Sequence, residues 1–183
     1  MNFILMMILL VSLVIPVYSF SGLGLGTDND PFEIANCTQL QEMENNLSAS
    51  YILTNNIDCS GISNFKPIGY CVGPSCISGI GDYPYTGNFN GNNYSISNLN
   101  IINLTPVGPG WGLFGFISES NITNVNLNNV FINVTSYSVG GLIGRSNYYS
   151  FVSNSSSSGS INGYEYVGGL IGYLSDNSFV SNS

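Results

Sequence analysis

The hexapeptide Val139-Gly140-Gly141-Leu142-Ile143-Gly144 recurs unchanged at residues 167–172. The two copies are 28 residues apart (167 − 139), and Phe-Val-Ser-Asn-Ser recurs at the same offset, at 151–155 and 179–183. A looser copy, Gly112-Leu113-Phe114-Gly115, begins 29 residues before Gly141 (141 − 112). A period of this length is typical of stacked repeats. We therefore expect a solenoid in which each repeat forms one turn, here called a rung.

The sequence between the glycine motifs predicts short strands joined by tight turns. Val125 and Leu127 alternate with asparagine, and the alternation resumes after the pair Asn128-Asn129. Period-two alternation is typical of half-buried strands, and asparagine tolerates the left-handed backbone that a corner needs. The motif glycines are interpreted as structural positions that let neighbouring rungs approach closely. These positions are Gly112, Gly115, Gly140, Gly141, Gly144, Gly168, Gly169 and Gly172.

Composition excludes several classes of function. Two basic residues face ten acidic ones, so the net charge of −8 disfavours nucleic acid as a partner. The chain contains no histidine, which excludes a Ser-His-Asp triad, and no cofactor motif is visible. Charged residues make up only 7% of the chain, so its solubility depends on Asn, Ser, Thr and Gly, as in extracellular β proteins.

The N-terminus predicts secretion. Residues 3–17 form a nearly continuous apolar run, and the small residues Val17 and Ser19 fit signal-peptidase cleavage after Ser19. No Lys or Arg precedes the run, so a retained signal anchor is the alternative. We thus expect a signal peptide at 1–19 and a secreted or cell-surface protein.

Three further regions follow the signal peptide. Residues 20–60 are expected to form an N-terminal cap with one short helix around 36–47 and a first strand at 51–53. Asn36 with Gln39, or Thr38 with Gln41, could form the helix capping box. Residues 61–86 are rich in Cys, Gly and Pro and are predicted to be a loop insertion, and 87–183 are predicted to be the repeats.

The cysteines and sequons fit an extracellular chain. Four cysteines, Cys37, Cys59, Cys71 and Cys76, predict disulfides; we expect Cys37–Cys59 and Cys71–Cys76, although three pairings are possible. Zinc binding is disfavoured by the spacing and by the absence of histidine. The glycosylation candidates are Asn36, Asn46, Asn93, Asn121, Asn133 and Asn154, whereas the sequon at Asn103 is poorer because Pro106 follows it.

The repeats resemble a known family. Segments 139–155 and 167–183 are similar to the GLUG repeat of bacterial, archaeal and protist surface proteins, and 85–99 and 30–58 resemble the parts that precede such repeats. The resemblance implies an all-β, right-handed parallel β-helix with a short N-terminal capping helix, in secreted or surface-displayed adhesin-like proteins. It implies structural rather than catalytic shared positions. Family members carry many repeats, whereas this sequence stops inside one, so we expect it to be truncated at the C-terminus.

A carbohydrate-active β-helix enzyme of the lyase or hydrolase type is the alternative function. Such enzymes use clustered carboxylates and a basic residue, whereas the acids here belong to no repeated pair and Arg145 takes the place of Tyr173 in the next repeat. These charges are interpreted as solvated loop charges, and Asp28-Asn29-Asp30 as a loop rather than a calcium site. The acids considered are Asp58, Asp82, Glu119, Glu165 and Asp176.

The preferred hypothesis is a non-catalytic protein without cofactor or metal that binds an extracellular protein or glycan surface. Its tyrosines near the repeats could form a sugar-stacking or protein-contact surface, although stacking in the core and between rungs is the expected use. These tyrosines are Tyr148, Tyr149, Tyr164, Tyr166 and Tyr173. Because a solenoid needs a cap at each end, self-association through an uncapped C-terminal rung is also expected.

Overall fold

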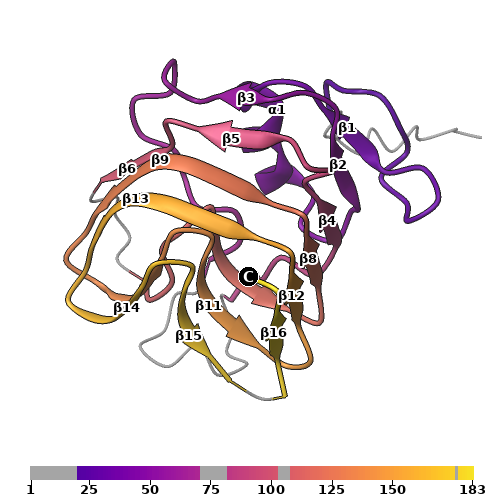
Figure 1. Cartoon of the computed structure of the whole chain (residues 1–183). Coiled ribbons are helices and arrows are strands. Elements are labelled where there is room, and N and C mark those ends of the chain that lie inside the picture. Colours follow the sequence, from indigo (N-terminus) through magenta and orange to yellow (C-terminus); the bar gives the residue numbers. More distant parts are fainter. Residues whose placement is uncertain (1–19, 71–81, 103–107, 176) are drawn as a thin grey trace, which may run out of the picture.

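The computed structural model describes residues 20–70, 82–102, 108–175 and 177–183. They form a parallel β-solenoid of about three turns with one short α-helix, which confirms the predicted fold class. Successive rungs stack from the indigo N-terminal end to the yellow C-terminal end (Figure 1). The predicted signal peptide at 1–19 lies outside the described residues. Within the described residues, no helix has the length and apolar character that a membrane-spanning segment needs.

Four parallel sheets form the walls of the solenoid, in the orders β1-β2-β4-β8-β12-β16, β15-β11-β7, β13-β9-β5-β3 and β10-β14, with β6 also paired to β9. The strands are β1 (Phe32–Ile34), β2 (Tyr51–Leu53), β3 (Ile57–Asp58), β4 (Asn88–Asn90), β5 (Ser95–Ser97), β6 (Asn100–Ile102), β7 (Phe114–Ser118), β8 (Asn121–Thr123), β9 (Asn126–Asn133), β10 (Tyr137–Gly140), β11 (Ile143–Asn147), β12 (Phe151–Ser153), β13 (Ser156–Asn162), β14 (Glu165–Gly168), β15 (Ile171–Leu174) and β16 (Phe179–Ser181).

Residues that are one repeat apart in the sequence are register partners on neighbouring strands. Val139 pairs with Val167 and Ile143 with Ile171, each at the 28-residue offset. Phe114 pairs with Ile143, so the looser glycine motif is one rung earlier, as predicted. Apolar residues of the rungs meet in a single core, in which Leu142, Ile143 and Val152 are fully buried.

The motif glycines lie where rungs touch. A Cβ built at Gly144 would come within 2.0 Å of the Trp111 nitrogen, and one at Gly112 within 2.6 Å of the Gly140 oxygen. Real Cβ atoms do not approach backbone this closely, so any larger residue would push the rungs apart. The packing at Gly112 and Gly144 fits their interpretation as structural positions, whereas a Cβ built at Gly169 would meet nothing within 4 Å.

Asparagine forms the corners. β9 runs through the predicted corner, and Asn129 has a φ of 54°, which is the left-handed conformation expected there. Asn124 and Asn154 have φ values of 56° and 49° at an equivalent corner of successive rungs. Short polar side chains thus allow the chain to change direction without glycine.

The helix covers the N-terminal end of the core. Helix α1 (Cys37–Glu42) continues as the 3₁₀-helix η1 (Met43–Asn45), and Leu40 and Met43 are fully buried in the solenoid core. Of the two predicted capping pairs, Asn36 and Gln39 are used: the Asn36 Oδ1 accepts from the Gln39 backbone N–H at 3.0 Å. The Gln39 Oε1 accepts from the N–H of Ala35 rather than of Asn36, at 2.8 Å. The cap is therefore a shifted form of the capping box.

A strand precedes this helix, which corrects the assignment of 51–53 as the first strand. β1 pairs in parallel with β2, and Ile34 is fully buried. Three residues are too few to show a period, so the sequence pattern did not reveal β1. The predicted Cys37–Cys59 disulfide is confirmed and ties α1 to the residue after β3, with a Cα–Cα distance of 5.2 Å. Cys71 and Cys76 lie outside the described residues.

Both ends of the predicted loop insertion at 61–86 belong to the solenoid. Ile68 bridges in parallel to Phe114, and Tyr85 to Ile117. Both Ile68 and Tyr85 are fully buried. These residues therefore extend the wall formed by β7, and the described part of the segment is anchored at each end.

A first column of hydrogen-bonded asparagine side chains begins at a carboxylate. The Asn121 amide donates to Asn88 Oδ1 at 3.0 Å, and the Asn88 amide donates to Asp28 Oδ1 at 2.7 Å. Ser50 Oγ also donates to Asp28. These hydrogen bonds, that from Ser50 first, lower the pKa of the Asp28 carboxyl. Asp28 thus ties the 20–31 loop to the solenoid wall.

A second column repeats this design. The Asn129 amide donates to Asn98 Oδ1 at 2.7 Å, and the Asn98 amide donates to Asp58 Oδ1 at 2.8 Å. The hydrogen bond from Asn98 and those from Ser60 lower the pKa of Asp58. All the amides donate toward the N-terminal end, so each column needs an acceptor there, and an ionised carboxylate supplies a strong one.

Candidate binding surface

Four tyrosines of the last two rungs form two exposed ring pairs, here called the tyrosine cluster. Tyr137 of β10 meets Tyr164 edge-to-face with ring centroids 5.3 Å apart, and Tyr166 of β14 meets Tyr173 of β15 in the same way at 5.4 Å. Tyr164 is 72% exposed and Tyr166 52%. An edge-to-face pair fixes ring orientation. Tyr137, Tyr164 and Tyr166 are exposed, whereas Tyr173 is half-buried.

Arg145 is built into this cluster. Its guanidinium carbon lies 4.4 Å from the centroid of the Tyr173 ring, within cation–π range. Its Nε donates to Asn147 Oδ1 at 3.2 Å, and the buried Asn147 also accepts from Ser175 Oγ at 2.9 Å. The interpretation of Arg145 as a solvated loop charge is therefore wrong, because the residue lies on strand β11 with its side chain held from two directions.

Three tyrosines near the cluster have a left-handed backbone: Tyr148, Tyr149 and Tyr166 have φ values of 46°, 51° and 54°. Ser138, which lies opposite Tyr166 in the preceding rung, has a φ of 56°, and Glu119, opposite Tyr148, has a φ of 51°. These conformations therefore belong to the repeated corners of the solenoid.

The expected burial in the core is wrong for Tyr149, Tyr164 and Tyr166, which are all more than half exposed. The expected stacking between rungs is seen where Tyr164 packs on Tyr137 of the preceding rung. The sequence alone did not separate exposed from buried tyrosines, because an alternating pattern does not say which side of a strand is covered.

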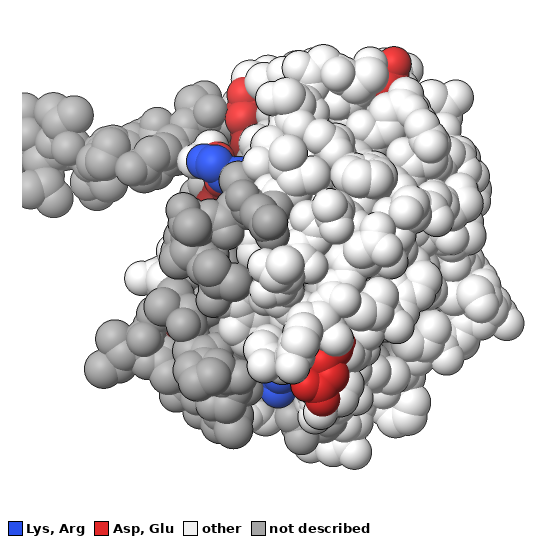
Figure 2. Space-filling model, turned by 90° about the vertical axis from the view of Figure 1, so that its left-hand side faces the viewer, with Lys and Arg blue, Asp and Glu red and all other residues white. Residues whose placement is uncertain are grey.

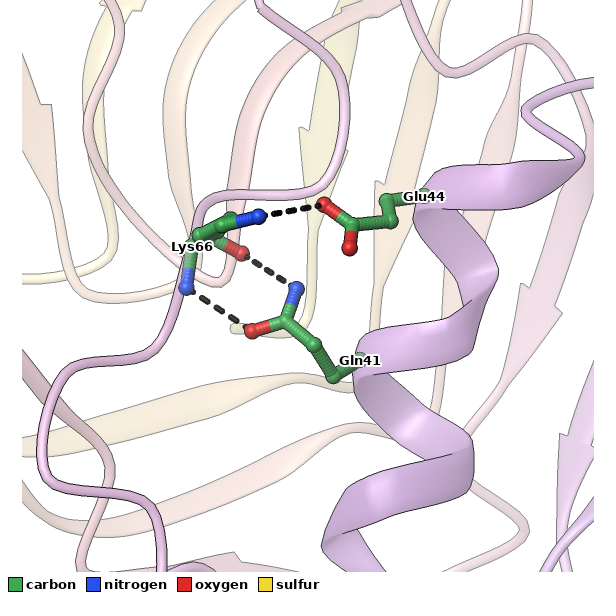
Figure 3. Close-up of polar contacts among 3 residues, drawn as sticks. All are labelled: Gln41, Glu44 and Lys66. Carbon is green, nitrogen blue, oxygen red and sulfur yellow. Dashed lines mark hydrogen bonds and ion pairs between the residues drawn. The ribbon is translucent and has the colours of Figure 1, made fainter.

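Charges are sparse on the surface. Figure 2 shows a face that is mostly uncharged, with acidic side chains in separate patches. Lys66 pairs with Glu44 at 3.7 Å, and its backbone N–H and C=O exchange hydrogen bonds with the Gln41 side chain at 2.9 and 3.0 Å (Figure 3). Lys66 therefore holds α1 against the 61–86 segment. Among the described residues Arg145 forms no ion pair.

The structure describes four of the five acids considered for catalysis, namely Asp58, Asp82, Glu119 and Glu165. Within the described part of the chain, no group of three or more His, Cys, Asp or Glu side chains is arranged to hold a metal ion. Asp58 accepts hydrogen bonds in the second asparagine column, and Asp176 lies outside the described residues. Arg145 contacts Tyr173 and Asn147.

A polar groove follows the corner between the β8-β12-β16 wall and the β9-β13 wall. The Asn124 amide donates to Asn90 at 3.0 Å and the Asn154 amide donates to Asn124 at 3.3 Å, which forms a third asparagine column along the groove. The groove carries amides and hydroxyls and no charged group. It is lined by Asn93, Asn124, Val125, Asn126, Asn154, Ser155, Ser156, Asn182 and Ser183.

The predicted glycosylation sites differ in availability. Asn46, Asn93 and Asn133 are exposed, and among the described residues their amide nitrogens donate no hydrogen bond. The amides of Asn121 and Asn154 donate to neighbouring rungs, so a glycan there would compete with an asparagine column. Asn36 is exposed and uses its Oδ1 as the helix cap, which leaves its amide nitrogen accessible.

Fold and surface together define a repeat protein of the parallel β-solenoid class. No family model matches the chain, so membership of the GLUG family stays a prediction. The chain is similar to Halomucin of Haloquadratum walsbyi (strain DSM 16790 / HBSQ001), with 30% identity over 156 residues that cover 79% of this chain. It spans about 2% of the length of Halomucin.

One solved structure is similar in part. A putative immunoglobulin A1 protease from Bacteroides ovatus superposes with a TM-score of 0.43 and 19% identity, covering 86% of this chain and 66% of that one. This likeness is too weak to carry a functional argument.

Proposed function

We propose that this chain is a secreted or surface-displayed, non-catalytic, adhesin-like β-solenoid that binds an extracellular glycan or protein surface through the tyrosine cluster. The observation that carries the proposal is the exposed ring pairs with Arg145 stacked on Tyr173. Tyrosine and arginine are enriched at binding interfaces, because they offer large apolar area together with polar tips. An open tyrosine ring face also suits the apolar face of a sugar.

Several features support an extracellular location. Disulfides persist in oxidising compartments, and Cys37–Cys59 closes within the cap. The low charge content, the accessible sequons and the apolar residues 3–17 fit a secreted glycoprotein. The similarity to a small part of Halomucin, a much longer protein, suggests that such a solenoid can serve as one module of a larger assembly.

The proposal is tested by removing two exposed rings. The double variant Tyr164→Ala/Tyr166→Ala should lose at least tenfold of its affinity for the glycans or cell surfaces that the unmodified protein binds in an array. Tyr149→Ala is the matched control, because Tyr149 is 70% exposed and contributes to neither ring pair. Thermal melting of all three proteins checks that folding is unchanged.

Binding that survives the double variant would show that the tyrosine cluster is not the site. Absence of binding to any glycan, protein or cell surface would remove the adhesin-like function altogether. Turnover of a bound polysaccharide, measured as new reducing or unsaturated ends, would support the enzyme alternative instead.

A further inference from the structure

The polar groove lies at a corner that one rung turns with two extra residues. Residues 124–125 connect β8 to β9, and residues 154–155 connect β12 to β13. Four residues, 91–94, connect β4 to β5 at the same corner, since Asn90 pairs with Thr123 and Ser95 with Asn126. Asn93 belongs to this longer connection and lines the groove in the earliest of its rungs.

The longer connection is a rigid turn. Asn92 and Asn93 have φ values of 49° and 62°, and Tyr94 N–H donates to the Gly91 oxygen at 2.8 Å. Two left-handed central residues closed by such a hydrogen bond form a type I′ turn. The Asn92 amide donates to the Leu53 oxygen of the preceding rung at 3.3 Å. The turn is therefore held in place, and it presents Asn93 to the groove in a fixed position.

The groove offers neutral hydrogen-bonding groups. The third asparagine column follows one side, and Asn126 and Ser156 lie across the buried Val125 and Ser155. Ser156 Oγ donates to Asn126 Oδ1 at 3.1 Å. The groove has a volume of about 440 Å³, within the range of about 300–1,000 Å³ that small-ligand sites have. Amides and hydroxyls both donate and accept, which suits the hydroxyl groups of a sugar.

Two sequon asparagines line the groove, and they differ in availability. Asn93 begins the sequon Asn-Tyr-Ser, is exposed, and among the described residues its amide nitrogen donates no hydrogen bond. The amide of Asn154 donates to Asn124 Oδ1 at 3.3 Å within the third column. Asn93 is thus the asparagine of the groove whose amide nitrogen is accessible for modification.

We propose that Asn93 carries an N-linked glycan whose first sugars lie in the polar groove and form hydrogen bonds with its amides and hydroxyls. The donor is an oligosaccharide linked to a lipid phosphate. The bond between its anomeric carbon and the phosphate oxygen breaks, the bond from this carbon to Asn93 Nδ2 forms, and one Nδ2 proton passes to the released lipid phosphate. The glycosylated groove is separate from the tyrosine cluster of β10, β14 and β15.

A saccharide from solution is the other source of the same chemistry. Such a ligand loses translational and rotational freedom on binding, and an open groove without charge compensates for little of that loss. A glycan linked to Asn93 is held beside the groove at a high effective concentration, so weak hydrogen bonds are enough to keep it there. The structure therefore favours the linked glycan.

The test uses the full chain secreted from a host that performs N-glycosylation. Mass spectrometry of glycopeptides should find Asn93 modified. An endoglycosidase that cleaves between the first sugars should release the Asn93 glycan from the folded protein at least about tenfold more slowly than glycans at Asn46 and Asn133, because it reaches only sugars that have left the groove. Asn46 and Asn133 are exposed sequons outside the groove. After denaturation the three rates should be equal.

A variant that fills the groove should remove this protection. Asn126→Phe places a ring among the lining residues at an exposed strand position, which tolerates an aromatic side chain. It should raise the release rate at Asn93 to that at Asn133. Asn128→Phe is the matched control, because Asn128 lies two residues further on the same face of β9 and does not line the groove. Thermal melting checks that both variants are folded.

Three results would overturn the inference. They are an unmodified Asn93, release at Asn93 as fast as at Asn46 and Asn133 in the folded protein, and protection that survives Asn126→Phe. The tyrosine cluster is unchanged in all these proteins, so failure here is distinguishable from failure of the proposed surface binding.

Discussion

The N-terminal and C-terminal rungs differ in how regular they are and in how well they are buried. In the longest sheet, the register offset falls from 38 residues between Tyr51 and Phe89 (89 − 51) to 28 between Phe151 and Phe179 (179 − 151). The irregular rungs nevertheless hold the largest buried side chains, among them Tyr51, Tyr85 and Phe89. The largest buried side chains thus lie in the rungs whose sequence does not repeat exactly.

The irregular end gains its stability from contacts that do not repeat. Tyr85 packs against Phe114 with ring centroids 5.1 Å apart, and its hydroxyl donates to the backbone oxygens of Ala49 and Asn88 at 3.0 and 2.9 Å as alternative acceptors. Burial raises the pKa of the Tyr85 hydroxyl well above its usual value, so it stays a neutral donor. These contacts and the Cys37–Cys59 disulfide stabilise the N-terminal rungs.

The largest expected effect is a difference in unfolding free energy between alanine variants of two isoleucines at the same repeat position. Ile143 is fully buried and pairs with Ile171, which is only partly buried. Ile143→Ala should lower the free energy of unfolding by about 3 kcal/mol, as expected for a cavity in a packed core. Ile171→Ala should cost about 1 kcal/mol, because its side chain already contacts solvent. Denaturant unfolding of both variants measures the difference, and equal costs would mean that the last rung is as well covered as its neighbour.

A smaller effect is expected from matched glycines. Gly141→Ala should destabilise the protein by about 2 kcal/mol, because the new methyl group overlaps the Gly169 carbonyl and Ser157. Gly169→Ala should change stability by less than about 0.5 kcal/mol, as for an open surface position. Thermal melting compares the two, and a large loss for Gly169→Ala would show that the space beside Gly169 is filled in solution.

The sequence predicted the features that depend on local patterns and did not predict those that depend on long-range strand pairing. The glycine motifs and the alternation around Asn128-Asn129 specify parallel rungs, because these signals depend only on local period. The strand β1 and the inclusion of Ile68 and Tyr85 in a wall depend on long-range pairing that no local pattern records. The helix cap was predictable from Asn36 because capping is local.

The binding surface was the least predictable part. The sequence placed the tyrosines near the repeats, but it did not show which of their side chains are exposed. The stacking of Arg145 on Tyr173 follows from the 28-residue register, which puts one residue directly beside the other across β11 and β15. A register deduced from the repeat would have been enough to predict this contact, since aligned residues on neighbouring strands touch.

The smallest effect concerns acid sensitivity, which should act on the N-terminal rungs alone. Hydrogen bonds lower the pKa values of Asp28 and Asp58 in the folded chain, so both carboxylates contribute stability above their unfolded pKa of about 4. That contribution is lost as the pH falls below about 4, through their folded values. Lowering the pH from 5 to 2.5 should therefore accelerate hydrogen exchange more around Asn88 and Asn98 than in β14–β16.

Neutral acceptors should remove this acid dependence. Asp28→Asn/Asp58→Asn keeps an oxygen for each asparagine column but cannot be protonated in this range, so its stability should change less with pH than that of the unmodified protein. Asp30→Asn is the control, because its carboxylate accepts no side-chain hydrogen bond among the described residues. If the double variant loses stability with acid as steeply as the control, other carboxylates set the acid response and the columns do not depend on ionised ends. If the double variant loses less stability with acid than the control, the carboxylates of Asp28 and Asp58 contribute part of the stability of the irregular N-terminal rungs.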